Sequence, residues 1–131
     1  MQITKFKIAG EKICVDYEDN NDKYRLISCD LPRNELRNCY TGISRDVCRE
    51  IGVDSAGFSE IAFSWHDDDS IKAAKIKLAI ETPFGMADLI LPEILLESGW
   101  LKDLVEAFAL EIQAYCSNKR AQLTFDDMGA Q

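Results

Sequence analysis

The stretch from Ser98 to Cys116 constrains this chain more than any other part of its sequence. Large apolar residues recur there at steps of three and four, which is the spacing of one stripe along an α-helix. A helix of this length is marginal in water unless another surface covers its apolar side. The rest of the sequence must therefore supply a second layer. The stripe consists of Trp100, Leu101, Leu104, Val105, Phe108, Ile112 and Tyr115.

Short alternating segments predict that this second layer is a β-sheet. Ile13, Val15 and Tyr17 alternate with polar residues, as expected for a strand with one buried face. Comparable segments cover residues 3–8, 23–28, 61–65, 75–80 and 86–91. The links between neighbouring segments are too short for parallel crossovers, so the strands are expected to pair antiparallel. Residues 93–96 are interpreted as a helical turn that leads into the last helix.

A further helix is predicted between the two groups of strands. Pro32 suits its first turn, where a missing N–H costs no hydrogen bond. Gly52 suits its end, because glycine readily adopts the left-handed conformation that stops a helix, and Val53 can then fold back on the last turn. Gly42 lies in its interior, which indicates a kink or close packing. The apolar residues of this helix at steps of three and four are Leu36, Tyr40, Ile43, Val47 and Ile51.

The order of elements indicates the fold class. Strands gathered in runs, each run followed by a helix, favour an α+β fold with an antiparallel sheet of about six strands in the order βββαβββα and two helices packed on one face. The two halves share this order without a repeat at the level of residues. We predict one domain over residues 1–118 and a polar, flexible C-terminal tail over residues 119–131.

Composition excludes several classes of function. The chain has 131 residues and a net charge of −8, from 15 basic and 23 acidic side chains. Direct nucleic-acid binding is disfavoured, because proteins that bind phosphate backbones need a basic face. No apolar run reaches the length that spans a bilayer, and residues 1–13 do not resemble a signal peptide. These features predict a cytoplasmic protein of unspecified oligomeric state.

The sequence contains no recognisable reactive centre. Its five cysteines form no C-x-x-C pair, so free, buried thiols that pack as small apolar residues are expected. The lone histidine, His66, precedes Asp67, Asp68 and Asp69, and this turn is interpreted as a solvated acidic hairpin that protects a sheet rim. No phosphate-binding glycine loop or serine nucleophile elbow is present. We predict no catalytic residue, metal site or cofactor, and hence a protein that is not an enzyme.

The C-terminal segment contains two apolar residues in a polar context. Leu123 and Phe125 are two positions apart, so in an extended chain they project to the same side and could enter one groove on a partner. Together with Gln122 they resemble the peptide through which bacterial proteins bind the replicative sliding clamp, whose usual pattern is Gln-Leu-x-Leu-Phe; the penultimate leucine is missing here. The alternative is that both residues fold back onto the chain's own sheet.

A broader resemblance covers roughly the second half of the chain. Residues 61–65, 74–78, 82–83 and 115–125 are similar to an uncharacterised family of small phage and prophage proteins that are often encoded near recombination and replication genes. The resemblance implies a phage accessory protein that binds a replication or recombination protein, with Gln122, Leu123 and Phe125 as the contact residues. Two alternatives stay open: an acidic counter-defence inhibitor of a host enzyme, and a ligand-binding protein or enzyme with a pocket under the C-terminal helix.

Overall fold

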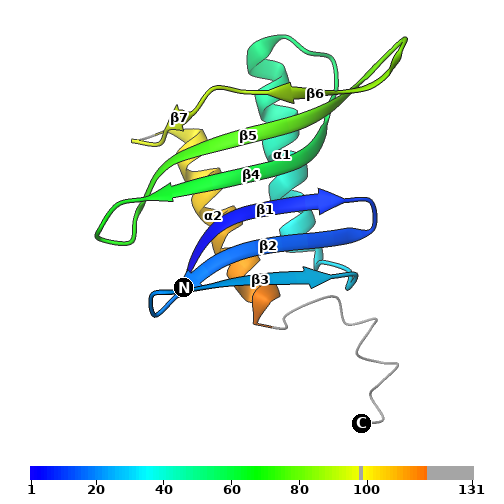
Figure 1. Ribbon diagram of the computed structural model, residues 1–131. Coiled ribbons are helices and arrows are strands. Elements are labelled where there is room, and N and C mark those ends of the chain that lie inside the picture. Colours follow the sequence, from blue (N-terminus) through cyan, green and yellow to red (C-terminus); the bar gives the residue numbers. More distant parts are fainter. Residues whose placement is uncertain (98, 118–131) are drawn as a thin grey trace.

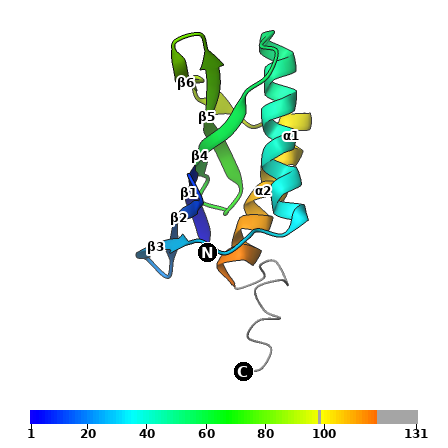
Figure 2. The same ribbon diagram turned by 90° about the vertical axis from the view of Figure 1, so that its right-hand side faces the viewer.

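The computed structural model describes residues 1–97 and 99–117 and has the α+β fold expected from the order of elements (Figure 1). Its sheet is antiparallel throughout and has seven strands. Both helices lie on the same face of the sheet, as the view in Figure 2 shows. In chain order the elements are β1 (Gln2–Ala9), β2 (Lys12–Asp19), β3 (Asp22–Ser28), α1 (Asn34–Ile51), β4 (Gly57–Trp65), β5 (Ile71–Thr82), β6 (Gly85–Ile90), β7 (Ile94–Leu95) and α2 (Trp100–Cys116).

The sheet order is symmetric about its centre. The strands lie side by side in the order β3-β2-β1-β4-β5-β6, so each three-stranded meander forms one half and β1 meets β4 in the middle. We call the β1–β4 junction the seam. Its ladder contains three residue pairs, from Lys5 opposite Ala62 to Lys7 opposite Glu60. The shared order of elements in the two halves of the sequence thus corresponds to a symmetric arrangement in space.

Tight turns set the register of the hairpins. Asn20 and Asn21 connect β2 to β3 with φ angles of 53° and 68°, which is the backbone of a two-residue hairpin turn that asparagine tolerates well. Pro83 and Phe84 connect β5 to β6, since Thr82 is paired with Gly85. The turn that contains His66 closes with a hydrogen bond from the His66 N–H to the Ser70 carbonyl at 2.8 Å.

The C-terminal end of α1 follows the prediction, whereas its start does not. Gly52 has a φ of 76°, and the N–H of Val53 returns to the carbonyl of Cys48 at 3.0 Å. The helix begins at Asn34, so the placement of Pro32 in its first turn is wrong. Arg33 precedes the helix with an extended backbone, and its guanidinium is held by Glu111 of α2 at 2.8 Å. The helical backbone thus begins at the residue that follows Arg33.

The buried side of α1 is broader than the predicted stripe. Leu36, Ile43 and Val47 are buried as expected, but Ile51 is 45% exposed and Cys48 is buried near it. The reason is that α1 packs against both β4 and α2, so its buried arc covers more than one row of side chains.

The short strand β7 replaces a predicted helical turn. Residues 93–96 were expected to be helical, but Ile94 and Leu95 pair with Ala74 and Ala73 of β5. β5 is 12 residues long, whereas β6 has 6. The first part of β5 therefore extends past the end of β6. There β7, rather than β6, pairs with the backbone of β5.

α2 packs on the helix-covered face of the sheet and contributes its buried side chains to the core. Val105, Phe108, Ile112 and Tyr115 are buried, in agreement with the predicted stripe. Trp100 is 45% exposed and does not belong to the buried side, because as the first helical residue it lies at the edge of the packed layer. The ring of Phe108 lies 5.2 to 6.4 Å from the rings of four aromatic residues on α1 and the sheet, namely Phe6, Tyr40, Phe58 and Phe63.

Candidate functional site

The sequence-predicted contact residues Gln122, Leu123 and Phe125 lie outside the described residues, as does all of 118–131. The candidate site must therefore be built from the surfaces of residues 1–97 and 99–117. Four surfaces differ from an ordinary solvated exterior: the face of the sheet opposite the helices, one end of that sheet, the outer edge of β6, and a groove beside α1.

The face of the sheet that the helices leave uncovered, the open face, has lysines on both sides of β4. The register places Lys5 of β1 and Lys75 of β5 on either side of Ala62. In the next row, Lys7 and Lys77 flank Glu60. Directly opposite residues on neighbouring strands project to the same face, so all four lysines extend from the open face near the middle of the sheet.

Ion pairs neutralise part of the open face. The Glu60 carboxylate lies 3.7 Å from the Lys5 ammonium and 3.9 Å from that of Lys77. Asp16 on β2 accepts two hydrogen bonds from the Arg25 guanidinium, at 2.7 and 3.2 Å, and this raises the pKa of Arg25. The face is thus a mixed pattern of charges within an acidic chain.

Carboxylates from two hairpins gather at one end of the sheet, which we call the acidic end. Gln2 lies between them: it is paired with Glu18 of β2, and its side-chain amide donates to Asp69 at 2.5 Å. The β2–β3 and β4–β5 turns extend from the same side of the sheet as the N-terminus (Figure 1). The N-terminal ammonium lies 3.6 Å from Asp19. Segments 16–22 and 67–69, which are far apart in sequence, are therefore neighbours in space.

The outer edge of β6, with its hairpin tip, exposes large apolar side chains; we call it the β6 edge. Phe84 at the tip is fully exposed, at 100%, while Met86 is 68% and Ile90 is 70% exposed. Leu95 on the neighbouring β7 adds a further side chain at 61%. A row of large apolar groups at a strand edge is unusual for a surface that faces only water.

The opposite edge of the sheet, β3, is built differently. Lys23 and Arg25 lie along it, and Asp22 begins it. Charged side chains on an edge strand discourage another strand from pairing with it. β6 has the sequence GMADLI, in which Asp88 is the single charged residue. The two edges therefore differ in their capacity to accept a further strand.

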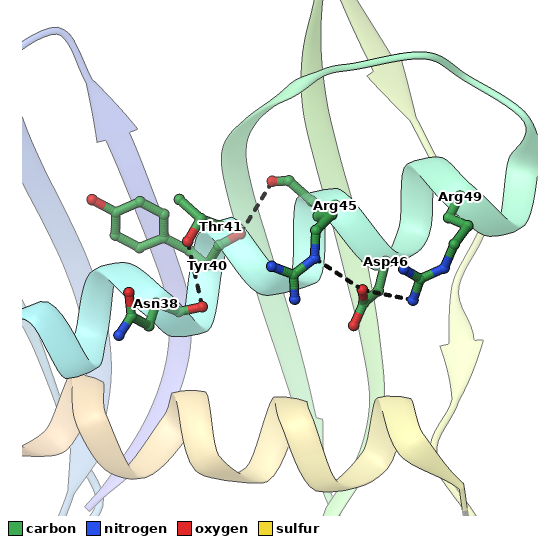
Figure 3. A network of polar contacts seen from close by, with 7 residues as sticks. Asn38, Tyr40, Thr41, Arg45, Asp46 and Arg49 are labelled. Atoms are coloured by element: carbon green, nitrogen blue, oxygen red, sulfur yellow. Dashed lines mark hydrogen bonds and ion pairs between the residues drawn. The ribbon is translucent and has the colours of Figure 1, made fainter.

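A groove of about 600 Å³ runs along the second half of α1 and the loop that follows it. Arg45 and Arg49 line this groove, and Asp46 lies between them with Oδ1 at 3.3 and 2.8 Å from their guanidinium nitrogens (Figure 3). The hydroxyls of Thr41 and Ser44 donate to backbone carbonyls one turn earlier, at 2.7 and 3.1 Å. The polar side chains that α1 contributes to the groove are thus engaged with one another or with the helix.

Among residues 1–97 and 99–117, no three histidine, cysteine or acidic side chains are placed to hold a metal ion. Asp68 has a lowered pKa because the Ser70 hydroxyl and N–H donate to its carboxylate. Burial raises the pKa of Cys39, with a smaller contribution from Glu111, so this thiol is a poor nucleophile.

The cysteines follow the sequence interpretation in part. All five are free. Cys48 is buried, and Cys14, Cys39 and Cys116 are partly buried, but Cys29 is exposed. Cys29 follows the last residue of β3 at the edge of the sheet, so it has no covering layer.

The β6 edge escaped the sequence reasoning, although the sequence contained a signal for it. Met86 and Ile90 alternate with Ala87 and Leu89, so the segment is apolar on both faces and lacks the polar side of an ordinary solvated strand. That pattern is typical of a strand whose two faces are both covered. In the structure the helices cover one face of the sheet, and Met86 and Ile90 are exposed on the other.

Comparison with protein-family models, with curated proteins and with solved structures found no match to this chain. Within the described residues, neither helix is both long and apolar enough to cross a membrane.

Proposed function

We propose that this chain is a non-enzymatic accessory protein of phage or prophage origin that acts in the cytoplasm by binding another protein. The observation that carries the binding role is the β6 edge, with Phe84, Met86 and Ile90 exposed in a row. Exposed apolar rows of this kind are typical of surfaces that another chain covers. The phage setting rests on the resemblance of the second half of the sequence.

A replication or recombination protein is the partner that this proposal favours. Gln122, Leu123 and Phe125 are its expected contacts, with the two apolar side chains as anchors and Gln122 hydrogen-bonded at the rim of the partner's groove. The partner that their pattern resembles most is the replicative sliding clamp. The tail and the β6 edge would then provide separate contacts on one small protein.

Direct binding to purified sliding clamp tests this partner. Three chains are immobilised separately: the full-length chain, a chain that lacks Thr124 to Gln131, and a chain with both Leu123→Ala and Phe125→Ala. We expect the full-length chain to retain the clamp, and the truncated and doubly substituted chains to lose it. The substitution Met128→Ala serves as the matched control, because it removes an apolar tail residue outside the pattern. Equal retention by all four chains would refute the proposed contacts.

The acidic end supports a second candidate function, a counter-defence inhibitor that occupies a basic surface of a host enzyme. This role requires the carboxylates of residues 16–22 and 67–69 to lie together, and the hydrogen bond between Gln2 and Asp69 brings the two turns to one end of the sheet. Binding driven by such charges weakens strongly with salt. A complex with a host enzyme that is insensitive to salt would count against this candidate.

The third candidate, a ligand pocket under α2, has weaker support. A hollow of about 300 Å³ lies beside α2, between Leu110 of the helix and Ile71 of β5, but the layer beneath the helix is filled. The side chains of Val105, Phe108 and Ile112 on its underside are fully buried, and the Phe108 ring lies 5.2 Å from that of Phe6 on β1. The layer between α2 and the sheet is therefore packed at this point.

A further inference from the structure

Along the β5–β6 hairpin, hydrogen-bonded residue pairs alternate with pairs that are not hydrogen-bonded. This alternation determines which N–H and C=O groups of β6 point away from β5. Leu91 donates its N–H to the carbonyl of Ile76 at 3.1 Å, so these two residues form a hydrogen-bonded pair. Hydrogen-bonded and non-hydrogen-bonded pairs alternate along an antiparallel ladder. Following the register back along β6 places the N–H and C=O groups of Met86, Asp88 and Ile90 on the side away from β5.

The same three residues project their side chains onto the open face. Ile90 is opposite Lys77, Asp88 opposite Ala79 and Met86 opposite Glu81. Leu89, between them, is opposite Leu78, which is fully buried on the helix side. An added strand would thus meet three pairs of free backbone groups, with an apolar, an acidic and an apolar side chain in order.

The charges around Asp88 determine which residues an added strand should carry opposite it. On the open face, Asp88 is diagonal to Glu81 and to Lys77, and Lys77 is paired with Glu60 at 3.9 Å. The chain as a whole has a net charge of −8. A residue placed opposite Asp88 therefore meets a negative potential, and a cross-strand pair of opposite charges is favourable there.

We propose that the β6 edge accepts an extended segment of a partner protein as an additional strand. The segment carries a lysine or arginine opposite Asp88 and an apolar residue two positions away on each side, opposite Met86 and Ile90. This pattern reads the same in both chain directions. The inference rests on the proposed binding function and specifies its contact on the described domain, independently of the tail and of any phage setting.

A second copy of this chain fits the β6 edge less well than a basic segment does. In the symmetric antiparallel register that uses all three residues of both copies, each Asp88 would lie opposite its own counterpart. Like charges directly opposite each other destabilise a strand pair. The two acidic chains would also repel each other at longer range.

Synthetic peptides test the proposal on the unaltered full-length chain. The probe is a peptide of about nine residues in which valine alternates with threonine and a lysine occupies the central valine position. One matched peptide has glutamate at the centre, and another has N-methyl groups on alternate backbone nitrogens. Binding is measured by fluorescence anisotropy up to about 2 mM peptide, and backbone amide shifts locate the bound site.

We expect the lysine peptide to bind about tenfold more tightly than the glutamate peptide, and the N-methylated peptide to lose binding. Amide shifts should be confined to β5, β6 and the turn between them. The substitution Asp88→Lys should reverse the preference between the two peptides, while Ile27→Lys on the β3 edge should leave it unchanged. The exposed position of Asp88 makes its substitution compatible with folding, and the peptide comparison holds without any variant.

Several outcomes would overturn the proposal. These are equal binding of the lysine and glutamate peptides, absence of binding, or amide shifts on β3. A dimer in sedimentation that Met86→Lys dissociates would assign the edge to a second copy instead. Clamp retention by the same variants separates the two hypotheses: β6 substitutions should leave it intact, and tail substitutions should leave peptide binding intact.

Discussion

Trp65 on β4 donates its indole N–H to the backbone carbonyl of Ile3 on β1 at 2.8 Å. This bond lies beyond the end of the seam, where the ladder between β1 and β4 runs from Lys5–Ala62 to Lys7–Glu60. It therefore extends the connection between the two halves of the sheet by a side-chain contact. The alternating sequence of β4 places Trp65 on the same side as Phe63, and the rings lie 6.4 Å apart.

Removing this donor should weaken the seam. Trp65→Phe retains a ring beside Phe63 but leaves the Ile3 carbonyl without its partner, so we expect a loss of about 1–3 kcal/mol in the free energy of unfolding. Urea denaturation followed by circular dichroism measures it. Trp100→Phe is the control, because Trp100 is 45% exposed and its replacement should change stability by less than about 0.5 kcal/mol. Equal effects of the two substitutions would contradict the role of the bond.

Phe108 should make a large contribution to the core. Its side chain is fully buried and its ring meets aromatic rings from α1, β1 and β4, so Phe108→Ala leaves a cavity that this packed layer cannot easily close. We expect a loss of about 3–5 kcal/mol in the free energy of unfolding. Leu110→Ala on the same helix, at a position 65% exposed, should cost less than about 0.5 kcal/mol. The same urea series distinguishes them, and a mild effect of Phe108→Ala would show that the core is loosely packed.

Periodicity in the sequence was sufficient for the order βββαβββα and for most of the buried sides, although Ile51 and Trp100 are exposed. Ile13, Val15 and Tyr17 pack as predicted because local alternation and burial coincide in a strand with one covered face. The stop of α1 at Gly52 was predictable because it depends on one residue's backbone freedom. These features are local, so a single sequence contains them.

The features that escaped prediction depend on which segments meet in space. β7 pairs with the part of β5 that extends beyond β6, and Pro32 lies outside α1, next to Arg33, which contacts Glu111 of α2. The outer edge of β6 lacks a neighbouring strand because β6 is the last strand in the order β3-β2-β1-β4-β5-β6, and this order was not deducible from periodicity. The predicted contacts Gln122, Leu123 and Phe125 stay a prediction, since they lie outside the described residues.

Gly42 inside α1 and Gly52 just after its end should respond to alanine in opposite ways. Gly52 has a φ of 76° with nothing within 4 Å of an added Cβ, so Gly52→Ala should cost about 1–2 kcal/mol through backbone strain alone. At Gly42 an added Cβ would lie 3.8 Å from Arg45 and 4.0 Å from Leu104, which is ordinary contact. Gly42→Ala should therefore stabilise the protein by up to about 1 kcal/mol through helix propensity. Thermal unfolding of both variants provides the test, and destabilisation by Gly42→Ala would indicate that α1 and α2 cannot separate enough to accept a methyl group.

The turn between β4 and β5 should contribute a pH dependence through Asp68. Its pKa lies below the ordinary value of 3.8, because the Ser70 hydroxyl donates to the carboxylate at 2.5 Å and the Ser70 N–H donates at 3.0 Å. A carboxyl group with a lowered pKa in the folded state stabilises that state above its unfolded pKa. This stability is lost as the pH falls through the folded-state pKa.

The substitution Ser70→Ala removes the hydroxyl and keeps the N–H, so the pKa of Asp68 should rise part of the way toward 3.8. Carbon-13 titration of the carboxylate measures this shift directly. The free energy of unfolding should be measured at a series of pH values. As the pH falls below 3.8, it should decrease more for the native chain than for Ser70→Ala. Ser64→Ala, at an exposed position of β4, should leave the titration of Asp68 unchanged. An unchanged pKa in Ser70→Ala would mean that the backbone hydrogen bond alone lowers it.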